Sequence, residues 1–171
     1  MPALIEVKLT ELAQLFNSMD PAPFHERDLD HDAEEFIVSW AQEHPRDDDL
    51  QLIIHLTNPS DETAKVQDSV RHYFTYRSDM LWREFRQLMK EGRSSLLIGL
   101  TFMAACEFAA LVVLQGDTTW KAMIREGLTI LGWVAMWRPL EIYLYRWWPL
   151  LGKRRLYQRL ARMTVKIKFT S

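Results

Sequence analysis

Residues 94–115 read SSLLIGLTFMAACEFAALVVLQ, and this stretch decides how the rest of the chain is interpreted. It is 22 residues long and carries a single charge, on Glu107. At about 1.5 Å per residue, a helix of that length reaches about 33 Å, enough to cross a hydrocarbon core of about 30 Å. The stretch therefore predicts a transmembrane helix.

A second apolar stretch, residues 128–151, is also long enough to span a membrane, although Arg138, Pro139, Glu141 and Arg146 interrupt it. We expect the two stretches to form a transmembrane hairpin, with a buried hairpin of a soluble protein as the alternative. Five of the seven tryptophans lie between residues 120 and 148, and aromatic rings followed by bases are typical of a membrane interface. The residues predicted to lie at that interface are Trp120, Tyr145, Trp147, Trp148, Lys153, Arg154 and Arg155.

The basic residues around the two stretches predict their orientation. Residues 77–93 and 146–166 together carry twelve Lys and Arg residues, whereas the connection between the stretches carries only Lys121 and Arg125. Because cytoplasmic flanks are enriched in bases, both termini are expected in the cytoplasm. The first residues also lack the basic and apolar regions of a signal peptide, which favours a cytoplasmic N-terminus.

Charge and hydropathy divide the chain into three parts. Residues 1–93 have 10 Lys and Arg against 19 Asp and Glu, whereas residues 94–171 have 11 against 4. We predict an α+β cytoplasmic part over residues 1–93, a transmembrane hairpin over 94–151, and a basic helix and strand over 152–171 that return to the cytoplasmic part.

Three segments with alternating apolar residues predict a small sheet. They are Ile5–Leu9, Leu50–Leu56 and Val165–Phe169. Leu50–Leu56 is apolar on both faces and should be the central strand, with the lysine-bearing C-terminal segment at an edge. Glu6 and the lysines Lys166 and Lys168 share the polar face, which allows cross-strand pairs of opposite charge.

Helical spacing marks three further segments. Asp32 is a plausible N-cap, with Glu35 completing a capping box, for a helix through residue 40. Apolar residues from Val66 to Leu88 recur at three, four and seven positions and predict a long amphipathic helix leading up to Gly92. In the tail, Leu156, Leu160 and Met163 repeat at helical spacing beside bases, which predicts either contact with anionic lipid headgroups or a solvated basic helix.

The densest polar segment is residues 25–32, followed by Glu34 and Glu35. Its acids imitate the start of a calcium loop, but Ala33 stands where the turn needs glycine and Ser39 where a glutamate ligand should be, so calcium is not expected. A mixed metal site with His25 and His31 is also disfavoured, because no pair has ligand spacing, and we read Glu34 and Glu35 as solvated acids. The residues considered for partner binding are Asp20, Phe24, His25, Glu26, Arg27, Asp28 and Asp30.

No motif indicates catalysis or a cofactor. The sequence has no glycine-rich phosphate loop, nucleophile elbow or Cys/His pair, and its single cysteine, Cys106, lies inside the first apolar stretch. The acidic cytoplasmic part argues against nucleic-acid binding. We therefore expect a non-enzymatic protein without a cofactor or bound metal.

Three charged residues of the apolar stretches are expected near the bilayer centre: Glu107, Arg138 and Glu141. An ionisable group near the bilayer centre costs about 2.5 to 3.5 kcal/mol on insertion scales, so each should be paired or face protein. Arg138 and Glu141 are three residues apart and can form a local ion pair. Glu107 and Arg138 lie at similar distances from the cytoplasmic ends of their stretches and could instead pair across the hairpin.

Three segments carry a resemblance to known proteins. They are residues 19–30 (MDPAPFHERDLD), 132–141 (GWVAMWRPLE) and 145–149 (YRWWP). Together they resemble a group of small bacterial inner-membrane proteins with two transmembrane helices and no assigned function. The resemblance implies a bacterial inner-membrane location and supplies no reaction or substrate.

These observations favour a membrane-anchored adaptor, assembly or regulatory protein that meets a protein partner or a second copy of itself. The alternative is a subunit of an oligomeric channel or transporter in which Glu107, Arg138 and Glu141 line a shared path. Two helices cannot enclose a pore, so that alternative requires an oligomer.

Overall fold

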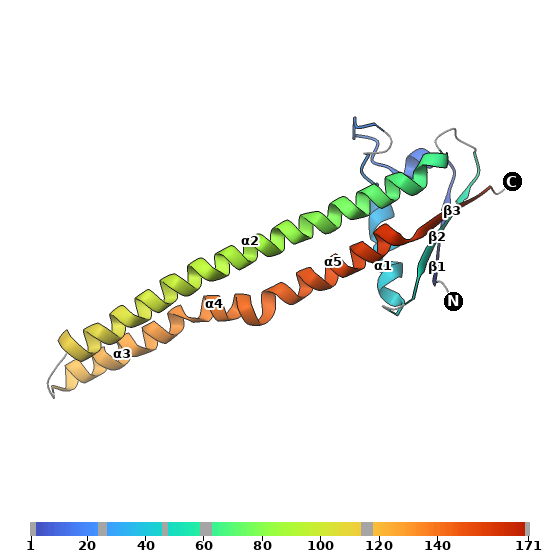
Figure 1. The fold of residues 1–171 in the computed structure, drawn as a ribbon. Helices are drawn as coiled ribbons and strands as arrows, with labels where there is room; N and C mark the ends of the chain where they lie inside the picture. Colours follow the sequence, from blue (N-terminus) through green and yellow to red (C-terminus); the bar gives the residue numbers. More distant parts are fainter. Residues whose placement is uncertain (1–2, 24–26, 46–47, 59–62, 114–117, 170–171) are drawn as a thin grey trace. The chain divides into compact units, whose positions relative to one another are not determined.

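The computed structural model describes residues 3–23, 27–45, 48–58, 63–113 and 118–169. It consists of two compact units: unit 1, made of residues 1–81 and 152–171, and unit 2, made of residues 82–151. Helix α2 and helix α5 each contribute residues to both units (Figure 1). The combination of helices with a small three-stranded sheet confirms the predicted α+β class.

Unit 1 contains a parallel sheet of three strands, β1 (Ala3–Leu9), β2 (Leu50–Leu56) and β3 (Thr164–Phe169). The order is β1-β2-β3, and both pairs of neighbours are parallel. The predicted strands, the central place of Leu50–Leu56 and the edge place of the C-terminal strand are confirmed. The parallel direction of the strands was not predicted.

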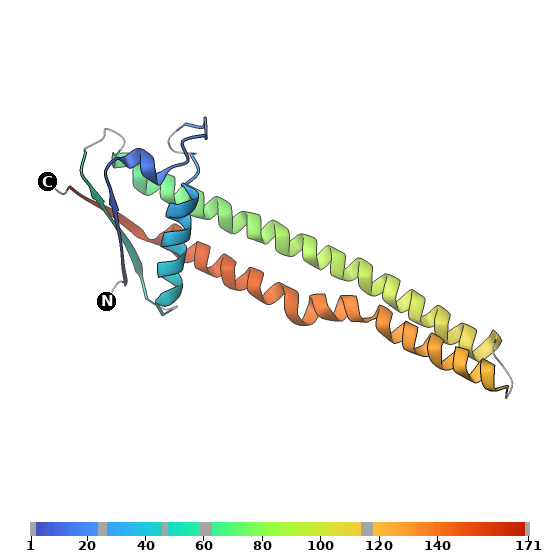
Figure 2. The same ribbon diagram turned by 180° about the vertical axis from the view of Figure 1, so that it is seen from behind.

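One face of this sheet is covered by helices. Figures 1 and 2 show α1 (His31–Glu43) with the nearby parts of α2 (Val66–Phe108) and α5 (Trp147–Arg162) on the same side of the strands. The strand residues on that side include Ile5, Leu52 and Ile54, which are fully buried. Alternation along each strand therefore places an apolar face on the helices and leaves the other face to charged side chains.

A side chain from α2 fixes the C-terminal strand in place. Gln67 donates from Nε2 to the Met163 carbonyl oxygen at 3.1 Å, and its Oε1 accepts from the Val165 amide at 2.6 Å. Both groups stand at the start of β3, where the backbone would otherwise lack partners. Gln67, a polar residue within the apolar Val66–Leu88 pattern, thus has a structural role that periodicity does not reveal.

Two local predictions in unit 1 were wrong. Helix α1 is capped by Asp30, whose carboxylate accepts from the Asp32 amide at 3.0 Å, so the helix starts two residues earlier than expected. Glu6 does not pair with Lys166 or Lys168, because β2 separates β1 from β3. Instead its carboxylate lies 3.6 Å from Nε2 of His55 on the central strand.

The apolar side of the basic tail lies in the core of unit 1. Tyr157, Leu160 and Met163 are each at most 3% exposed. Arg159 donates to the carbonyl oxygens of Pro45 and Asp48, both at 2.9 Å. Leu160 and Met163 therefore pack inside unit 1, and contact of the basic side chains with anionic lipid headgroups stays a prediction.

Unit 2 is a helical hairpin. Its first arm is the remainder of α2 with the π-helical segment η3 (Ala109–Val113), and its second arm runs through α3 (Thr119–Ala135), α4 (Trp137–Glu141), the π-helical segment η4 (Ile142–Arg146) and the start of α5. Helix α2 continues without a break past Gly92, where the amphipathic helix was expected to end. The sequence pattern changes there from amphipathic to apolar, but the backbone does not.

Small residues bring the two arms together. A Cβ atom placed on Gly99 would lie 3.0 Å from the carbonyl oxygen of Ala135, and one placed on Gly132 would lie 3.2 Å from the Met103 side chain. In a regular helix the amide of residue 139 would donate to the Ala135 carbonyl oxygen, but residue 139 is proline and has no N–H. That carbonyl oxygen lies against Gly99 instead. Cys106 is buried near the Gly132 contact. Close approach through small residues is typical of helix pairs in membranes.

One helix among the described residues, Thr63–Val112, is long and apolar enough to cross a membrane. Only 17% of its most apolar window is buried, unlike the core helix of a soluble protein. The predicted second span over residues 128–151 is not confirmed. Helix α3 ends at Ala135, and the chain then passes through α4 and η4, with Arg138, Glu141 and Arg146 in this interrupted part.

Candidate functional site

The most elaborate polar site in the structure surrounds the carboxylate of Glu34 in unit 1. Glu34 lies on α1, on the same side as Ile37 and Ala41, which are fully buried. It is itself only 6% exposed. The expectation that Glu34 is a solvated acid is therefore wrong, and the spacing of three and seven residues from Ile37 and Ala41 was the available signal.

Three side chains donate hydrogen bonds to this carboxylate. The Tyr73 hydroxyl donates to Oε2 and the Tyr157 hydroxyl to Oε1, each at 2.6 Å. Arg77 donates to Oε1 from Nε at 3.2 Å and from Nη2 at 3.1 Å. Because Tyr73 and Arg77 are one helical turn apart on α2 and Tyr157 is on α5, one carboxylate joins three helices of unit 1.

The electrostatics of the cluster keep Glu34 ionised. Burial raises the pKa of its carboxyl, but the hydrogen bonds from Tyr157 and Tyr73 and the charge of Arg77 outweigh this, so the pKa lies below its ordinary value. Burial and the bond to Glu34 raise the pKa of Tyr157 to about 12 and that of Tyr73 further. At neutral pH both phenols are donors and the carboxylate is the acceptor, as the geometry requires.

This arrangement suits a structural role better than acid or base catalysis. Both carboxylate oxygens already accept short hydrogen bonds, and the Arg77 guanidinium carbon lies 5.9 Å from the centre of the Tyr157 ring. A general base needs a free lone pair within reach of a substrate proton. The Glu34 cluster, meaning Glu34, Tyr73, Arg77 and Tyr157, therefore holds α1 against the parts of α2 and α5 in unit 1.

The acidic loop considered for partner binding is organised by its own carboxylates. Asp20 accepts from the Ala22 amide at 2.9 Å and from the Asp28 amide at 2.8 Å, and these two bonds lower the pKa of Asp20. Asp30 caps α1. Arg27 is half-buried and Asp28 exposed, whereas Phe24, His25 and Glu26 lie outside the described residues. Partner binding by this loop stays a prediction.

No group of three or more potential metal ligands is found among the described residues. His31 begins α1 and is exposed there. His25, the other histidine weighed for a mixed metal site, falls in one of the undescribed gaps.

The three charges of the apolar stretches do not form one group. Nη1 of Arg138 lies 3.2 Å from Oε2 of Glu141, as expected for a local pair three residues apart. Glu107 lies instead beside an open cavity of about 400 Å³ that it shares with Arg125 and Glu126 of α3. The predicted pairing of Glu107 with Arg138 is wrong, because the Gly99 and Gly132 contacts set a register in which the two are separated along the hairpin.

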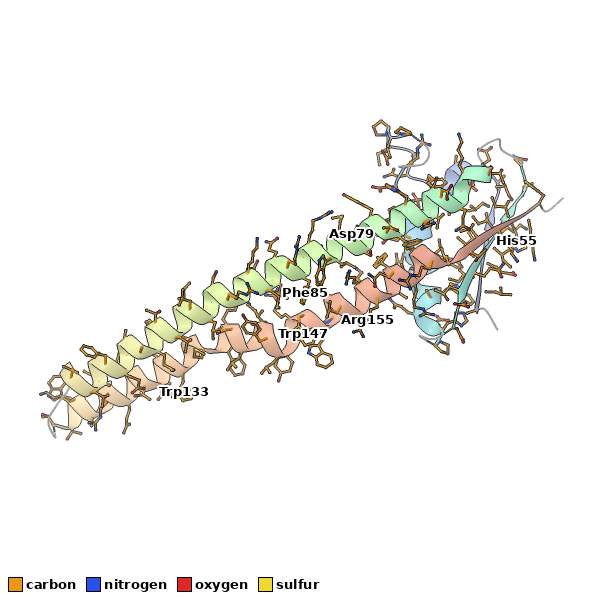
Figure 3. All side chains as sticks on the ribbon, viewed as in Figure 1. His55, Asp79, Phe85, Trp133, Trp147 and Arg155 are labelled. Carbon is orange, nitrogen blue, oxygen red and sulfur yellow. The ribbon has the colours of Figure 1, made fainter. Side chains whose placement is uncertain are left out.

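The predicted interface residues are mostly solvent-accessible. Trp120, Tyr145 and Trp148 are 54%, 70% and 64% exposed, and Lys153 and Arg155 are also exposed. Trp147 is half-buried and donates from Nε1 to the Tyr143 carbonyl at 2.7 Å, while Arg154 is half-buried as well. Figure 3 shows Trp133, another large side chain of the hairpin, projecting from α3. Their contact with a membrane interface stays a prediction.

The open face of the sheet carries a row of bases. The sequence had placed Lys166 and Lys168 on the polar face, but not Lys8 and His55 beside them. The strand register places Lys8 beside His55 and His55 beside Lys168. Lys166 lies on the same face, and Glu6 and Lys8 line an open cavity of about 420 Å³ with Val7 and His55. Figure 3 shows His55 on the side of the sheet away from the helices. Predicting that Lys8, His55 and Lys168 lie side by side would have required the strand register, which a single sequence does not provide.

Comparison of the chain with protein-family models, curated proteins and solved structures finds no match. Its resemblance to small bacterial inner-membrane proteins therefore rests on the three sequence segments alone.

Proposed function

We propose that the protein is a membrane-anchored, non-enzymatic adaptor, assembly or regulatory protein of the bacterial inner membrane. Its hairpin is held in the bilayer, and both ends of the chain are in the cytoplasm. The observation that carries this proposal is the surface of unit 2, which is apolar over both arms. Exposed fractions reach 69% for Leu97, 68% for Leu111, 67% for Trp133 and 62% for Val134.

Exposure of such a large apolar surface to water would be unfavourable for an isolated hairpin. Large exposed apolar patches mark contacts with a membrane or another protein. Glycines at residues 92, 99 and 132 allow close approach of the arms, as small residues do in membrane helix pairs. The second arm carries a proline and the Arg138–Glu141 pair, and a paired charge facing protein or an interface is compatible with insertion.

A membrane assay tests this placement. The full chain, expressed in a bacterial host, should remain in the membrane pellet after washing with alkaline carbonate and should float with vesicles in a density gradient. A reporter that fluoresces only in the cytoplasm should be active when fused after Ser171. Recovery of the untagged chain in the soluble fraction would overturn the proposal.

The adaptor role is supported by the open face of the sheet in unit 1. Parallel sheets are usually covered on both faces, whereas helices cover only one face of this sheet. The open face presents Lys8, Lys166 and Lys168 with His55, against a single acid, Glu6. Lys8 and Lys168 flank His55 on this face, and three lysines against one glutamate favour an acidic partner. We propose that an acidic segment of a cytoplasmic protein docks there.

Site-specific photocrosslinking in cells tests the docking face. A photoreactive residue in place of Leu4, which is 46% exposed on this face, should capture a defined protein through an acidic peptide. Combining it with Lys8→Glu and Lys168→Glu should remove the crosslink, whereas Arg71→Glu, an exposed base on α2, should leave it intact. A crosslink that survives both reversals, or a captured peptide without acidic residues, would contradict this face as the docking site.

A further inference from the structure

The cavity beside Glu107 lies wholly within unit 2 and has an unusual lining. Its charged residues are Glu107 from α2 and Arg125 and Glu126 from α3. Thr129 adds a hydroxyl, and Ala110, Leu111 and Ile130 add apolar walls. Two carboxylates, one guanidinium and one hydroxyl therefore surround an open space of about 400 Å³.

These three charges do not satisfy one another. Among the described residues, no opposite charge lies within 4 Å of Glu107, Arg125 or Glu126. Arg125 and Glu126 are successive residues of one helix, so their side chains point in different directions. In a bilayer, charges without partners are costly, and such residues mark binding sites or pathways.

The backbone beside the cavity is also irregular. Ala110 and Leu111 belong to η3, a π-helical segment that ends the first arm. Short π-helical segments occur frequently at functional sites, because the wider turn redirects side chains and alters backbone hydrogen bonding. This irregularity is independent of the charges and coincides with them.

The place of the cavity in the hairpin fits the boundary between headgroups and hydrocarbon. Helix α3 begins at Thr119, and the lining residues of α3 run from Arg125 to Ile130. Arg125 and Glu126 precede residue 128, where the second apolar stretch begins, so they are expected at the edge of the membrane-spanning part. Trp120, at the helix start, has the exposure expected of an interface aromatic.

We propose that this cavity binds a phosphoethanolamine group, the headgroup of phosphatidylethanolamine. Its primary ammonium has three N–H donors for the carboxylates of Glu107 and Glu126 and the Thr129 hydroxyl. Its phosphate accepts from the Arg125 guanidinium, whose planar donors match phosphate oxygens. The glycerol and first methylene groups of the lipid lie against Leu111 and Ile130. This inference rests on the proposed membrane placement.

The chemistry separates this ligand from other common headgroups. Phosphocholine has the same charges but a quaternary ammonium with no N–H donor, so it loses the hydrogen bonds to both carboxylates. Phosphatidylglycerol has no cation at all, and two carboxylates repel it. A preference for a primary ammonium next to a phosphate is therefore the signature of the site.

Native mass spectrometry of the full chain in detergent tests the proposal. The chain is mixed with equal amounts of phosphatidylethanolamine, phosphatidylcholine and phosphatidylglycerol with identical acyl chains. We expect about tenfold more adduct with phosphatidylethanolamine than with phosphatidylcholine, the ratio that loss of a charge-assisted hydrogen bond produces. Equal retention of the two lipids would overturn the inference.

Matched variants locate the site. Glu107→Gln and Arg125→Gln should each remove the preference, whereas Glu84→Gln and Arg86→Gln, exposed charges elsewhere on the same hairpin, should keep it. A preference that persists in Glu107→Gln and Arg125→Gln would overturn the assignment to this cavity. Arg125 is exposed, so its variant retains the packing of the arms.

Two further measurements are needed. One distinguishes the lipid headgroup from free phosphoethanolamine as the ligand, and the other distinguishes failure of the cavity proposal from failure of the membrane placement. Water-soluble phosphoethanolamine, added in excess, should fail to displace the lipid; if it alone binds, with the same variant dependence, the site is the one proposed and its ligand is the free compound. The carbonate-washed membrane fraction is assayed in parallel. Absence of the chain from that fraction refutes the membrane placement, whereas presence there without a lipid preference refutes only the cavity.

Discussion

The two units of this protein differ in how many large apolar side chains they expose. Unit 1 buries large side chains, such as Phe74, Leu52 and Ile54, and exposes the charges of its sheet. In unit 2, glycines such as Gly99 and Gly132 lie where the arms approach closely, and many large apolar side chains are exposed, although Ile142 is buried. This difference is the one expected if unit 1 lies in water, which drives large apolar groups inward, and unit 2 lies in lipid, as proposed, where packing depends on close approach of backbones.

The units also differ in how they use charge. In unit 1 a carboxylate is buried with three donors and joins three helices. In unit 2 the charges stay near the surface of the hairpin, either in the local Arg138–Glu141 pair or around the Glu107 cavity. Substitutions of these charged residues or of the packing glycines should therefore destabilise one unit and leave the stability of the other unchanged.

The largest effect is expected from Glu34→Gln. The amide keeps the volume but removes the charge that Arg77 and the two phenols surround, and breaking a buried ion pair costs about 3 kcal/mol. Amide hydrogen exchange of α1 and β2 should accelerate about 100-fold, with no change in the hairpin. The neighbouring Glu35→Gln, on an exposed residue, should have no effect. Unchanged protection in Glu34→Gln would show that the cluster does not hold unit 1 together.

The next effect is expected from Gly99→Ala. The added Cβ would lie 3.0 Å from the Ala135 carbonyl oxygen, so the arms must separate, at a cost of about 1 to 3 kcal/mol. Unfolding in mixed micelles with increasing dodecyl sulfate, followed by circular dichroism, measures the change. Gly127→Ala is the matched control: nothing lies within 4 Å of its Cβ position, and helix propensity should stabilise it by up to about 1 kcal/mol. Equal behaviour of the two variants would refute close packing of the arms.

A smaller effect is expected from pH, and only in unit 1. The pKa of Glu34 is lowered from its ordinary value of 4.5, so its stabilisation is complete above pH 4.5 and is lost as pH falls further. The pKa of Tyr157 is raised from 10.0 to about 12, so its contribution is complete below pH 10 and is lost as pH rises towards 12. Thermal unfolding of unit 1 should show a plateau between these limits. Glu34→Gln should abolish the loss of stability at acidic pH. If unit 1 still loses stability there in that variant, other groups are responsible.

Local patterns in the sequence predicted the strands, but not the contacts that join them. Alternation in Leu50–Leu56 identified the central strand because burial on both faces leaves it apolar. The burial of Glu34 depended on Tyr73 and Tyr157, which are 39 and 123 residues away and carry no mark of proximity. The helical spacing from Ile37 was the only local sign.

The hairpin was predicted in outline and missed in detail. The apolar character of residues 94–115 identified the first arm, and Arg138 and Glu141 formed the local pair that their spacing allows. The register between the arms depends on where glycines meet the opposite backbone, and one sequence does not reveal this. That register separates Glu107 from Arg138 and places it beside Arg125 and Glu126 instead.

The most direct test of the central claim is cysteine accessibility in intact bacterial cells. In a background with Cys106→Ser, single cysteines at Thr118, before α3, and at Asn58, after β2, are treated with a membrane-impermeant maleimide. We predict that the cysteine at 118 reacts in intact cells that have a permeable outer membrane, and that the cysteine at 58 reacts only after lysis. Labelling of both positions only after lysis would contradict a hairpin that crosses the membrane.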